Sequence, residues 1–165
     1  MKKVVFSIML IVGSALCADD TTKFTFGDEC EFDRFYVSAG AGIMLSEGGG
    51  SHDVRRLGGA AMRTSWYLSE FWAVECELGV FEDNVLLGVD ALWHWWGYER
   101  FDPFFNFGAC GIIGSSGEIG PKFGAGFFYH LTEKLSLRFD ADALLGLEDE
   151  TEIVYTLTTG VQISF

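Results

Sequence analysis

The stretch VYTLTTGVQISF, residues 154–165, decides the fold because apolar and polar side chains alternate along it. The apolar side chains stand at Tyr155, Leu157, Val161, Ile163 and Phe165, and the positions between them hold Thr, Gly, Gln and Ser. A period of two is the period of a β-strand, whose successive side chains point to opposite faces. The stretch is therefore predicted to be a strand with one apolar and one polar face.

Composition extends this prediction to the whole chain. The 165 residues suffice for one domain, and 21 glycines, 16 phenylalanines and only 2 prolines indicate a β-rich domain rather than a helical bundle or a disordered chain. The formal net charge of -13 argues against a nucleic-acid partner, because binding a phosphate backbone requires a basic surface.

The first residues have the pattern of an export signal. Lys2 and Lys3 precede an apolar run, and small residues follow up to Ala18. We expect a cleaved signal peptide over 1–18, a periplasmic lead-in over 19–32 and a β-barrel over 33–165. Cys17 raises a lipoprotein alternative, although Leu16 is larger than the residue that usually precedes a lipidated cysteine.

Cleavage would leave three cysteines, Cys30, Cys76 and Cys110. An odd number in an oxidising compartment gives no complete disulfide framework. We expect packed thiols, with Cys30 as the candidate for pairing between molecules.

Eight segments of strand length follow one another, separated by turn-forming residues. They lie near 33–45, 57–68, 71–82, 84–96, 103–113, 120–131, 134–147 and 152–165. Short connections alternate with more variable ones, as in an up-and-down meander, and seven connections between eight strands put both ends of the chain on the same side of the barrel. Apart from the first residues, no apolar run is long enough for a transmembrane helix.

Alternation gives each segment an apolar and a charged face, and by itself it does not tell which face points inward. A soluble lipocalin-like barrel would bury the apolar face, whereas a membrane barrel inverts this arrangement. Small residues such as Gly40, Gly42, Gly108 and Gly124 gather on the polar face, which suits the crowded interior of an eight-stranded barrel. Aromatic residues gather beside the short connections, which is typical of a membrane interface. The expected interface aromatics are Trp66, Trp72, Trp93, Trp95, Trp96 and Tyr129, joined by Phe35 and Phe165.

These motifs in this order resemble the small outer-membrane β-barrels of the OmpA, OmpX and opacity-protein type. Members of that family end on an alternating strand with a terminal Phe, and the turns at Tyr67-Leu68 and Leu131-Thr132-Glu133 and the run from Pro103 to Gly108 add to the similarity. The resemblance implies an all-β, eight-stranded antiparallel up-and-down transmembrane β-barrel in the outer membrane of a diderm bacterium. It further implies a terminal strand read by the barrel assembly machinery, at Tyr155, Leu157, Val161, Ile163 and Phe165. Lipids and lipopolysaccharide would surround a monomer.

Under this interpretation the polar face lines the lumen. The expected polar network comprises Arg63, Glu75, Glu77, Asp90, His94, Lys122, Arg138, Asp140 and Asp142, with Asn106, His130 and Gln162 nearby. Unpaired buried charge is costly, so these groups should form ion pairs across the strands. We expect a lumen filled by side chains and a structural or envelope-integrity role; a small ion-conducting pore and a soluble periplasmic binder of a hydrophobic ligand are the alternatives.

The sequence favours no enzyme, cofactor or metal site. Asp90 and His94 share a face and could form an acid-oriented histidine, but no serine stands beside them. Three scattered histidines give no metal-ligand spacing. The connection Ser46 to Arg56 is the expected place for surface recognition. Glu82-Asp83 and Glu148-Asp149-Glu150 make an acidic rim that could bind the divalent cations that bridge lipopolysaccharide.

Overall fold

The computed structural model describes residues 34–47, 54–69, 71–95, 100–114, 117–132, 134–147 and 153–165. The expected signal peptide, the lead-in, Cys30, His52, Trp96 and Glu148 to Glu150 lie outside these residues. Eight strands make up the described chain: β1 (Arg34–Glu47), β2 (Val54–Tyr67), β3 (Trp72–Phe81), β4 (Asn84–His94), β5 (Phe101–Ile113), β6 (Ile119–His130), β7 (Leu135–Leu145) and β8 (Ile153–Ser164). A search of the same residues finds no helix of the length and apolarity that crossing a membrane requires.

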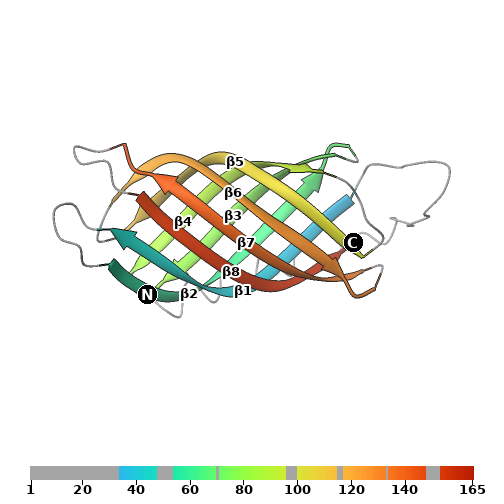
Figure 1. Cartoon of the computed structure of the whole chain (residues 1–165), viewed down its shortest axis with the longest axis horizontal. Coiled ribbons are helices and arrows are strands. Elements are labelled where there is room, and N and C mark those ends of the chain that lie inside the picture. Colours follow the sequence, from blue (N-terminus) through green and yellow to red (C-terminus); the bar gives the residue numbers. More distant parts are fainter. Residues whose placement is uncertain are drawn as a thin grey trace.

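The strands close into one barrel in chain order, each antiparallel to its neighbours (Figure 1). β1 pairs with β2 from Arg34↔Tyr67 to Glu47↔Val54, and with β8 from Tyr36↔Ser164 to Ser46↔Val154. Closure leaves no edge along the wall, and it satisfies backbone groups that a membrane could not. The predicted all-β, eight-stranded up-and-down topology is confirmed.

The barrel has two ends of different construction. The connections after β2, β4 and β6 lie at one end, here called the turn end, together with the start of β1 and the C-terminus (Figure 1). Two turns there use the same hydrogen bonds. Leu68 and Ser69 N–H donate to the carbonyl of Trp72, as Leu131 and Thr132 N–H donate to that of Leu135. The Ser69 and Thr132 hydroxyls each accept from the backbone N–H groups two and three residues further along the chain. The other four connections lie at the opposite end, here called the loop end.

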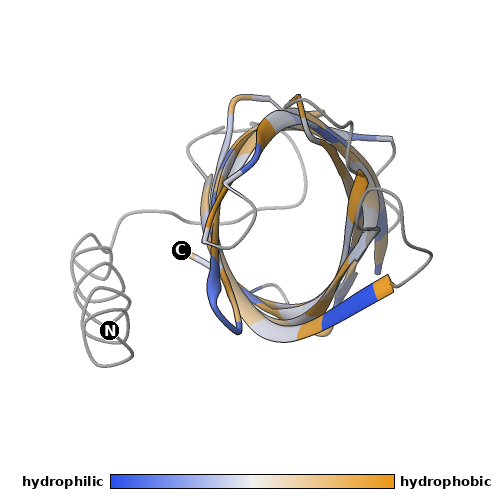
Figure 2. Ribbon diagram, turned by 90° about the vertical axis from the view of Figure 1, so that its left-hand side faces the viewer, coloured by the Kyte–Doolittle hydropathy of each residue, from blue (hydrophilic) through white to orange (hydrophobic). Residues whose placement is uncertain are grey.

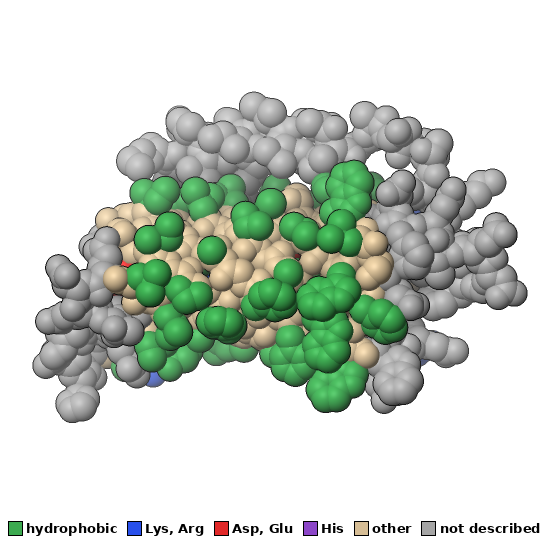
Figure 3. Space-filling model, turned by 90° about the horizontal axis from the view of Figure 1, so that it is seen from above, with side chains coloured by type: hydrophobic (Ala, Val, Ile, Leu, Met, Phe, Trp, Pro, Cys, Tyr) green, Lys and Arg blue, Asp and Glu red, His purple; other side chains and the backbone are tan. Residues whose placement is uncertain are grey.

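Side chains alternate between a crowded interior and an exposed exterior. β3 shows it most clearly, with Glu75 and Glu77 buried between exposed Trp72, Val74 and Cys76. Hydrophobic and hydrophilic residues alternate along the ribbon in Figure 2, and Figure 3 shows apolar side chains spread over the face of the outer wall that it presents. The charged face points inward, which is opposite to the lipocalin arrangement.

Two details differ from the sequence predictions. β1 and β2 extend through Ser46, Glu47 and Val54 to Arg56, so the connection between them is shorter than expected, because a twisted hairpin continues its own ladder beyond the barrel rim. Cys76 lies exposed on the outer face instead of being packed, while Cys110 is buried on the inner face.

Candidate functional site

The lumen contains a belt of charged side chains, here called the charged belt. Its members are Arg63, Glu75, Glu77, Asp90, Lys122, Arg138, Asp140 and Asp142, each at most 5% exposed. They come from β2, β3, β4, β6 and β7, whose inner faces meet at mid-height. Three basic groups thus face five acidic ones away from bulk solvent.

Arg138 is the most enclosed cation of the charged belt. Its guanidinium makes a two-pronged contact with Glu75, with Nη2 2.8 Å from Oε1 and Nη1 bonded to Oε2. Its Nε and Nη2 also donate to Asp140 at 2.7–3.0 Å. The same group lies 5.2 and 5.1 Å from the ring centroids of Phe104 and Phe128. Arg suits this place because its planar fork binds carboxylates in pairs and stacks on rings.

Arg63 connects the two halves of the charged belt. Its Nη2 lies 2.6 Å from Glu77 and donates to the Thr158 hydroxyl at 3.0 Å. Its Nη1 lies 3.4 Å from Asp140, and its Nε lies 3.7 Å from Glu75. Arg63 therefore shares both carboxylates of Arg138, which makes the two guanidiniums one network.

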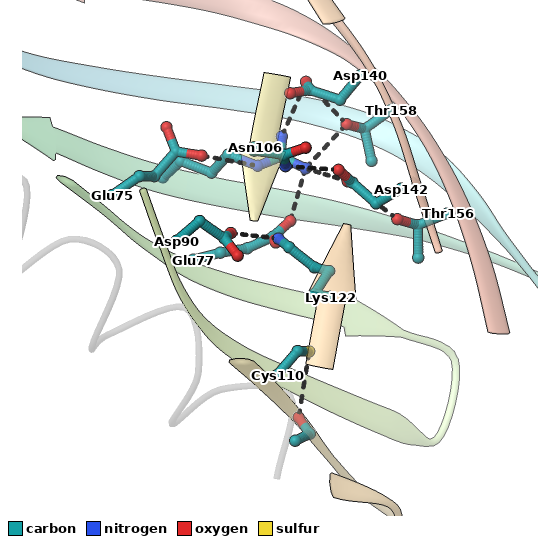
Figure 4. A network of polar contacts seen from close by, with 12 residues as sticks. Glu75, Glu77, Asp90, Asn106, Cys110, Lys122, Asp140, Asp142, Thr156 and Thr158 are labelled. Carbon is teal, nitrogen blue, oxygen red and sulfur yellow. Dashed lines mark hydrogen bonds and ion pairs between the residues drawn. The ribbon is translucent and has the colours of Figure 1, made fainter. Parts of the chain in front are cut away.

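Lys122 holds the remaining side of the charged belt. Its ammonium bonds Glu77 and lies 2.5 Å from Asp90 (Figure 4). Because Glu77 also contacts Arg63, the pairs at Lys122 and at Arg63 are joined. The belt is a continuous network of groups from five strands, not a set of isolated ion pairs.

Asp142 is held chiefly by uncharged donors. The Asn106 amide donates to its Oδ1 at 2.7 Å, and the Thr156 hydroxyl donates to Oδ2 at 3.2 Å (Figure 4). Gly124 makes room for this contact, because a Cβ there would lie 2.1 Å from Asp142 Oδ1 and 2.3 Å from Asn106 Oδ1. A side chain at residue 124 would displace the very atoms that satisfy the carboxylate.

Apolar side chains flank the charged belt on both sides. A loop-end cluster contains Met44, Phe81, Leu86, Cys110, Ile112, Leu144 and Val154, and a turn-end cluster contains Ala73, Leu92, Phe104 and Phe128 with Tyr67 against it. The sequence prediction of a polar lumen missed these clusters. Alternation could not reveal these clusters in runs such as 103–107, because aromatic residues stand on both faces of the strand there and neither face can be identified as the polar one.

His94 lies at the turn end, away from the charged belt. Its Nδ1 is 2.8 Å from Asp102 Oδ2 and 3.3 Å from the Tyr67 hydroxyl. Asp90 and His94, which share a face and could have paired, do not contact each other: Asp90 binds Lys122 in the charged belt, and His94 contacts Asp102. Asp102 was missed because it lies on the next strand, and only the β4–β5 register brings it beside His94.

A serine also lies beside a histidine, at His130. The Nδ1 of His130 is 2.7 Å from the Ser136 hydroxyl, across the register pair that joins β6 and β7. The hydrogen bonds of the described residues include no acidic partner for His130, so the pair lacks the third member that a nucleophilic serine needs. In the same residues, no group of three or more His, Cys, Asp or Glu side chains has the geometry to hold a metal ion.

The expected interface aromatics form a belt around the turn end. Trp66, Trp72, Trp93, Trp95 and Tyr129 are all exposed on the outer face. Trp93 stacks on Trp95 and on Phe105, with ring centroids 6.1 and 6.0 Å apart. Large apolar side chains gather toward this end in Figure 3. Indole rings with one polar edge favour the boundary between hydrocarbon and headgroups.

The residues of the expected assembly signal lie together on the outer face of β8. Tyr155, Leu157, Val161, Ile163 and Phe165 are all exposed. The backbone N–H of Phe165 donates to the carbonyl of Phe35 at 3.0 Å, and their rings lie 6.5 Å apart. This stretch is thus both the last strand and one side of the seam with β1.

Comparison with family models and with curated proteins gave no match to this chain. Comparison with solved structures found several similar β-barrels. The N-terminal β-barrel domain of Pseudomonas aeruginosa OprF is similar at 22% identity, with a TM-score of 0.56, over 79% of this chain and 97% of that one. Ail, the attachment invasion locus protein of Yersinia pestis, is similar at 13% identity and a TM-score of 0.60, over 81% and 99%. Neisserial surface protein A is similar at 15% identity and a TM-score of 0.61, over 79% and 97%.

These structures share the closed barrel and little sequence, so the likeness establishes the fold. The apolar exterior and the aromatic belt agree with it, since both match a bilayer and not water. The fold of this chain is therefore the closed eight-stranded antiparallel β-barrel that the OprF domain, Ail and Neisserial surface protein A share.

Proposed function

We propose that this protein is a sealed barrel of the outer membrane of a diderm bacterium, with a structural role in the envelope. The observation that carries the proposal is the charged belt, in which Arg138 and Arg63 bind carboxylates directly. An ion entering this space would have to separate pairs that are already satisfied, and apolar clusters flank them on both sides. Eight strands enclose little more room than their own side chains fill.

The placement in the membrane is supported by the outer wall. Val89 in mid-strand is 55% exposed, and Leu157 and Phe123 are similarly uncovered. Lipids, including lipopolysaccharide, are the partners that cover such a wall without cost, and a monomer needs no other. The barrel assembly machinery would read the outer face of β8, with Phe165 at its end.

Conductance in planar bilayers tests the sealed lumen. Refolded protein, shown to be folded by its heat-dependent migration in gel electrophoresis, should leave the bilayer at its baseline conductance. Stable single-channel steps would contradict the proposal and favour the small pore. A Phe104→Ala and Phe128→Ala double variant removes the rings stacked on Arg138 but leaves the charged belt and the loop-end cluster in place, so it should also stay at the baseline conductance if the belt is the seal.

Membrane fractionation tests the placement separately. The protein should be recovered with the outer membrane. Recovery in the soluble periplasm would contradict the proposed location, whatever the lumen conducts.

A further inference from the structure

The β1–β2 hairpin extends beyond the rest of the barrel at the loop end. β2 pairs with β1 as far as Val54, but its pairing with β3 stops at Gly59↔Phe81 (Figure 1). In the described part of the chain, residues 54–57 therefore have a strand partner on one side only. The wall is closed everywhere below this point, so this short segment is a free edge.

The backbone groups available on this edge follow from the position of Gly58. Glu82 binds Gly58 on the β3 side, with Glu82 N–H 3.2 Å from the Gly58 carbonyl and Gly58 N–H 3.4 Å from Glu82 Oε1. In an antiparallel ladder every second residue turns both its N–H and its C=O to the same neighbour. Arg56 and Val54 therefore present their N–H and C=O groups to the free side.

The side chains on the edge have a distinct character. Val54 is 48% exposed, and Arg55 and Arg56 are exposed on opposite faces of the strand. Neither guanidinium has an ion-pair partner among the described residues, whereas both lumen arginines have several. An exposed strand edge that carries two arginines and an apolar residue can bind another extended chain as an added strand.

The two arginines of this edge indicate which kind of strand can pair with it. In antiparallel pairing, each side chain meets the one directly opposite on the same face, where opposite charges attract and like charges repel. A second copy of this edge would bring arginines together, so a copy of the chain is disfavoured. The matching strand carries two consecutive acidic residues, opposite Arg56 and Arg55, followed by an apolar residue opposite Val54.

We propose that residues 54–57 dock an extended acidic segment of another protein by adding it as a strand to the β1–β2 hairpin. The inference goes beyond the sealed barrel of the proposed function and rests on it only for placing the loop end outside the membrane. Conductance and fractionation do not report on this edge, so the two proposals fail separately.

The test uses the full barrel in detergent micelles and a fluorescent peptide of sequence TTVEEVTT, with TTVKKVTT as the matched control. Fluorescence anisotropy should show binding of the acidic peptide alone. Arg55→Glu with Arg56→Glu should reverse the preference, because each charged pair is rebuilt with opposite sign. The affinity of this double variant for the acidic peptide should be lower than that of the unmodified barrel by about tenfold or more.

A second pair of variants separates strand addition from simple charge attraction. Arg56→Ala removes the charge, and Arg56→Pro also removes the N–H on the free side, where proline is tolerated. The proline variant should bind about fivefold more weakly than the alanine variant. Val54→Pro serves the same purpose if Arg56→Pro loses its heat-dependent migration. Equal binding by the proline and alanine variants, or no binding of either peptide to the unmodified barrel, would overturn the inference.

Discussion

The charged belt and the lipid-facing wall are two sides of the same strands, a few ångströms apart, and they follow different rules. Inside, Arg138 must meet Glu75 and Asp140 with correct geometry, because each group left unpaired would be costly. Outside, Val89 or Phe123 has only to be apolar, since lipid makes no directional demand. The loss of stability caused by an interior substitution should therefore depend on which partner groups it leaves unpaired. The loss caused by an exterior substitution should depend on its depth in the membrane.

The largest expected effect is the loss of the central cation. Arg138→Met leaves Glu75 and Asp140 buried with Arg63 as their remaining cation, and should lower the free energy of unfolding by about 3 to 5 kcal/mol. Urea titration of the barrel in bilayers measures this. A triple variant with Glu75→Gln and Asp140→Asn should recover part of the loss. If the triple variant were as unstable as Arg138→Met, packing rather than charge would explain the cost.

A charge on the outer wall should have the next largest effect, and one that depends on depth. Val89 lies in mid-strand opposite Cys76 and Ala109, whereas Leu137 lies opposite Tyr129 in the aromatic belt. Val89→Arg should cost about 2 to 4 kcal/mol and Leu137→Arg about 0 to 1, because an arginine near the interface reaches the headgroups. The same titration compares them. Equal costs at both depths would contradict the assignment of the belt to the membrane boundary.

The smallest expected loss of stability comes from filling the space that an inner-face glycine leaves for neighbouring polar side chains. Gly124→Ala places a Cβ against Asp142 and Asn106 and should cost about 1 to 3 kcal/mol. Gly58→Ala is the control, since its Cβ would have no atom within 4 Å, and it should change stability little. Thermal unfolding in micelles checks both. Similar melting temperatures for the two variants would mean that the interior accommodates an added methyl group as easily as the exposed position does.

The alternation that predicted the strands also predicted which residues share a face, because a strand turns successive side chains to opposite sides. This is why Glu75 and Glu77 could be grouped against Trp72 and Val74 from the sequence alone. The tight turns were equally readable, since Ser69 and Thr132 bind the backbone locally. These features depend on neighbours in the chain, and the sequence contains them in full.

Alternation by itself left open which face points inward, and only the closed barrel decided which polar group contacts which. Arg138 and Glu75 lie 63 residues apart and meet across the lumen, and His94 binds Asp102 instead of Asp90. Phe104 and Phe105 are adjacent in the sequence and are the same type of residue, yet Phe104 is buried beside Arg138 and Phe105 is exposed. Register and closure are set by the cooperative pairing of eight strands, and no local pattern contains that information.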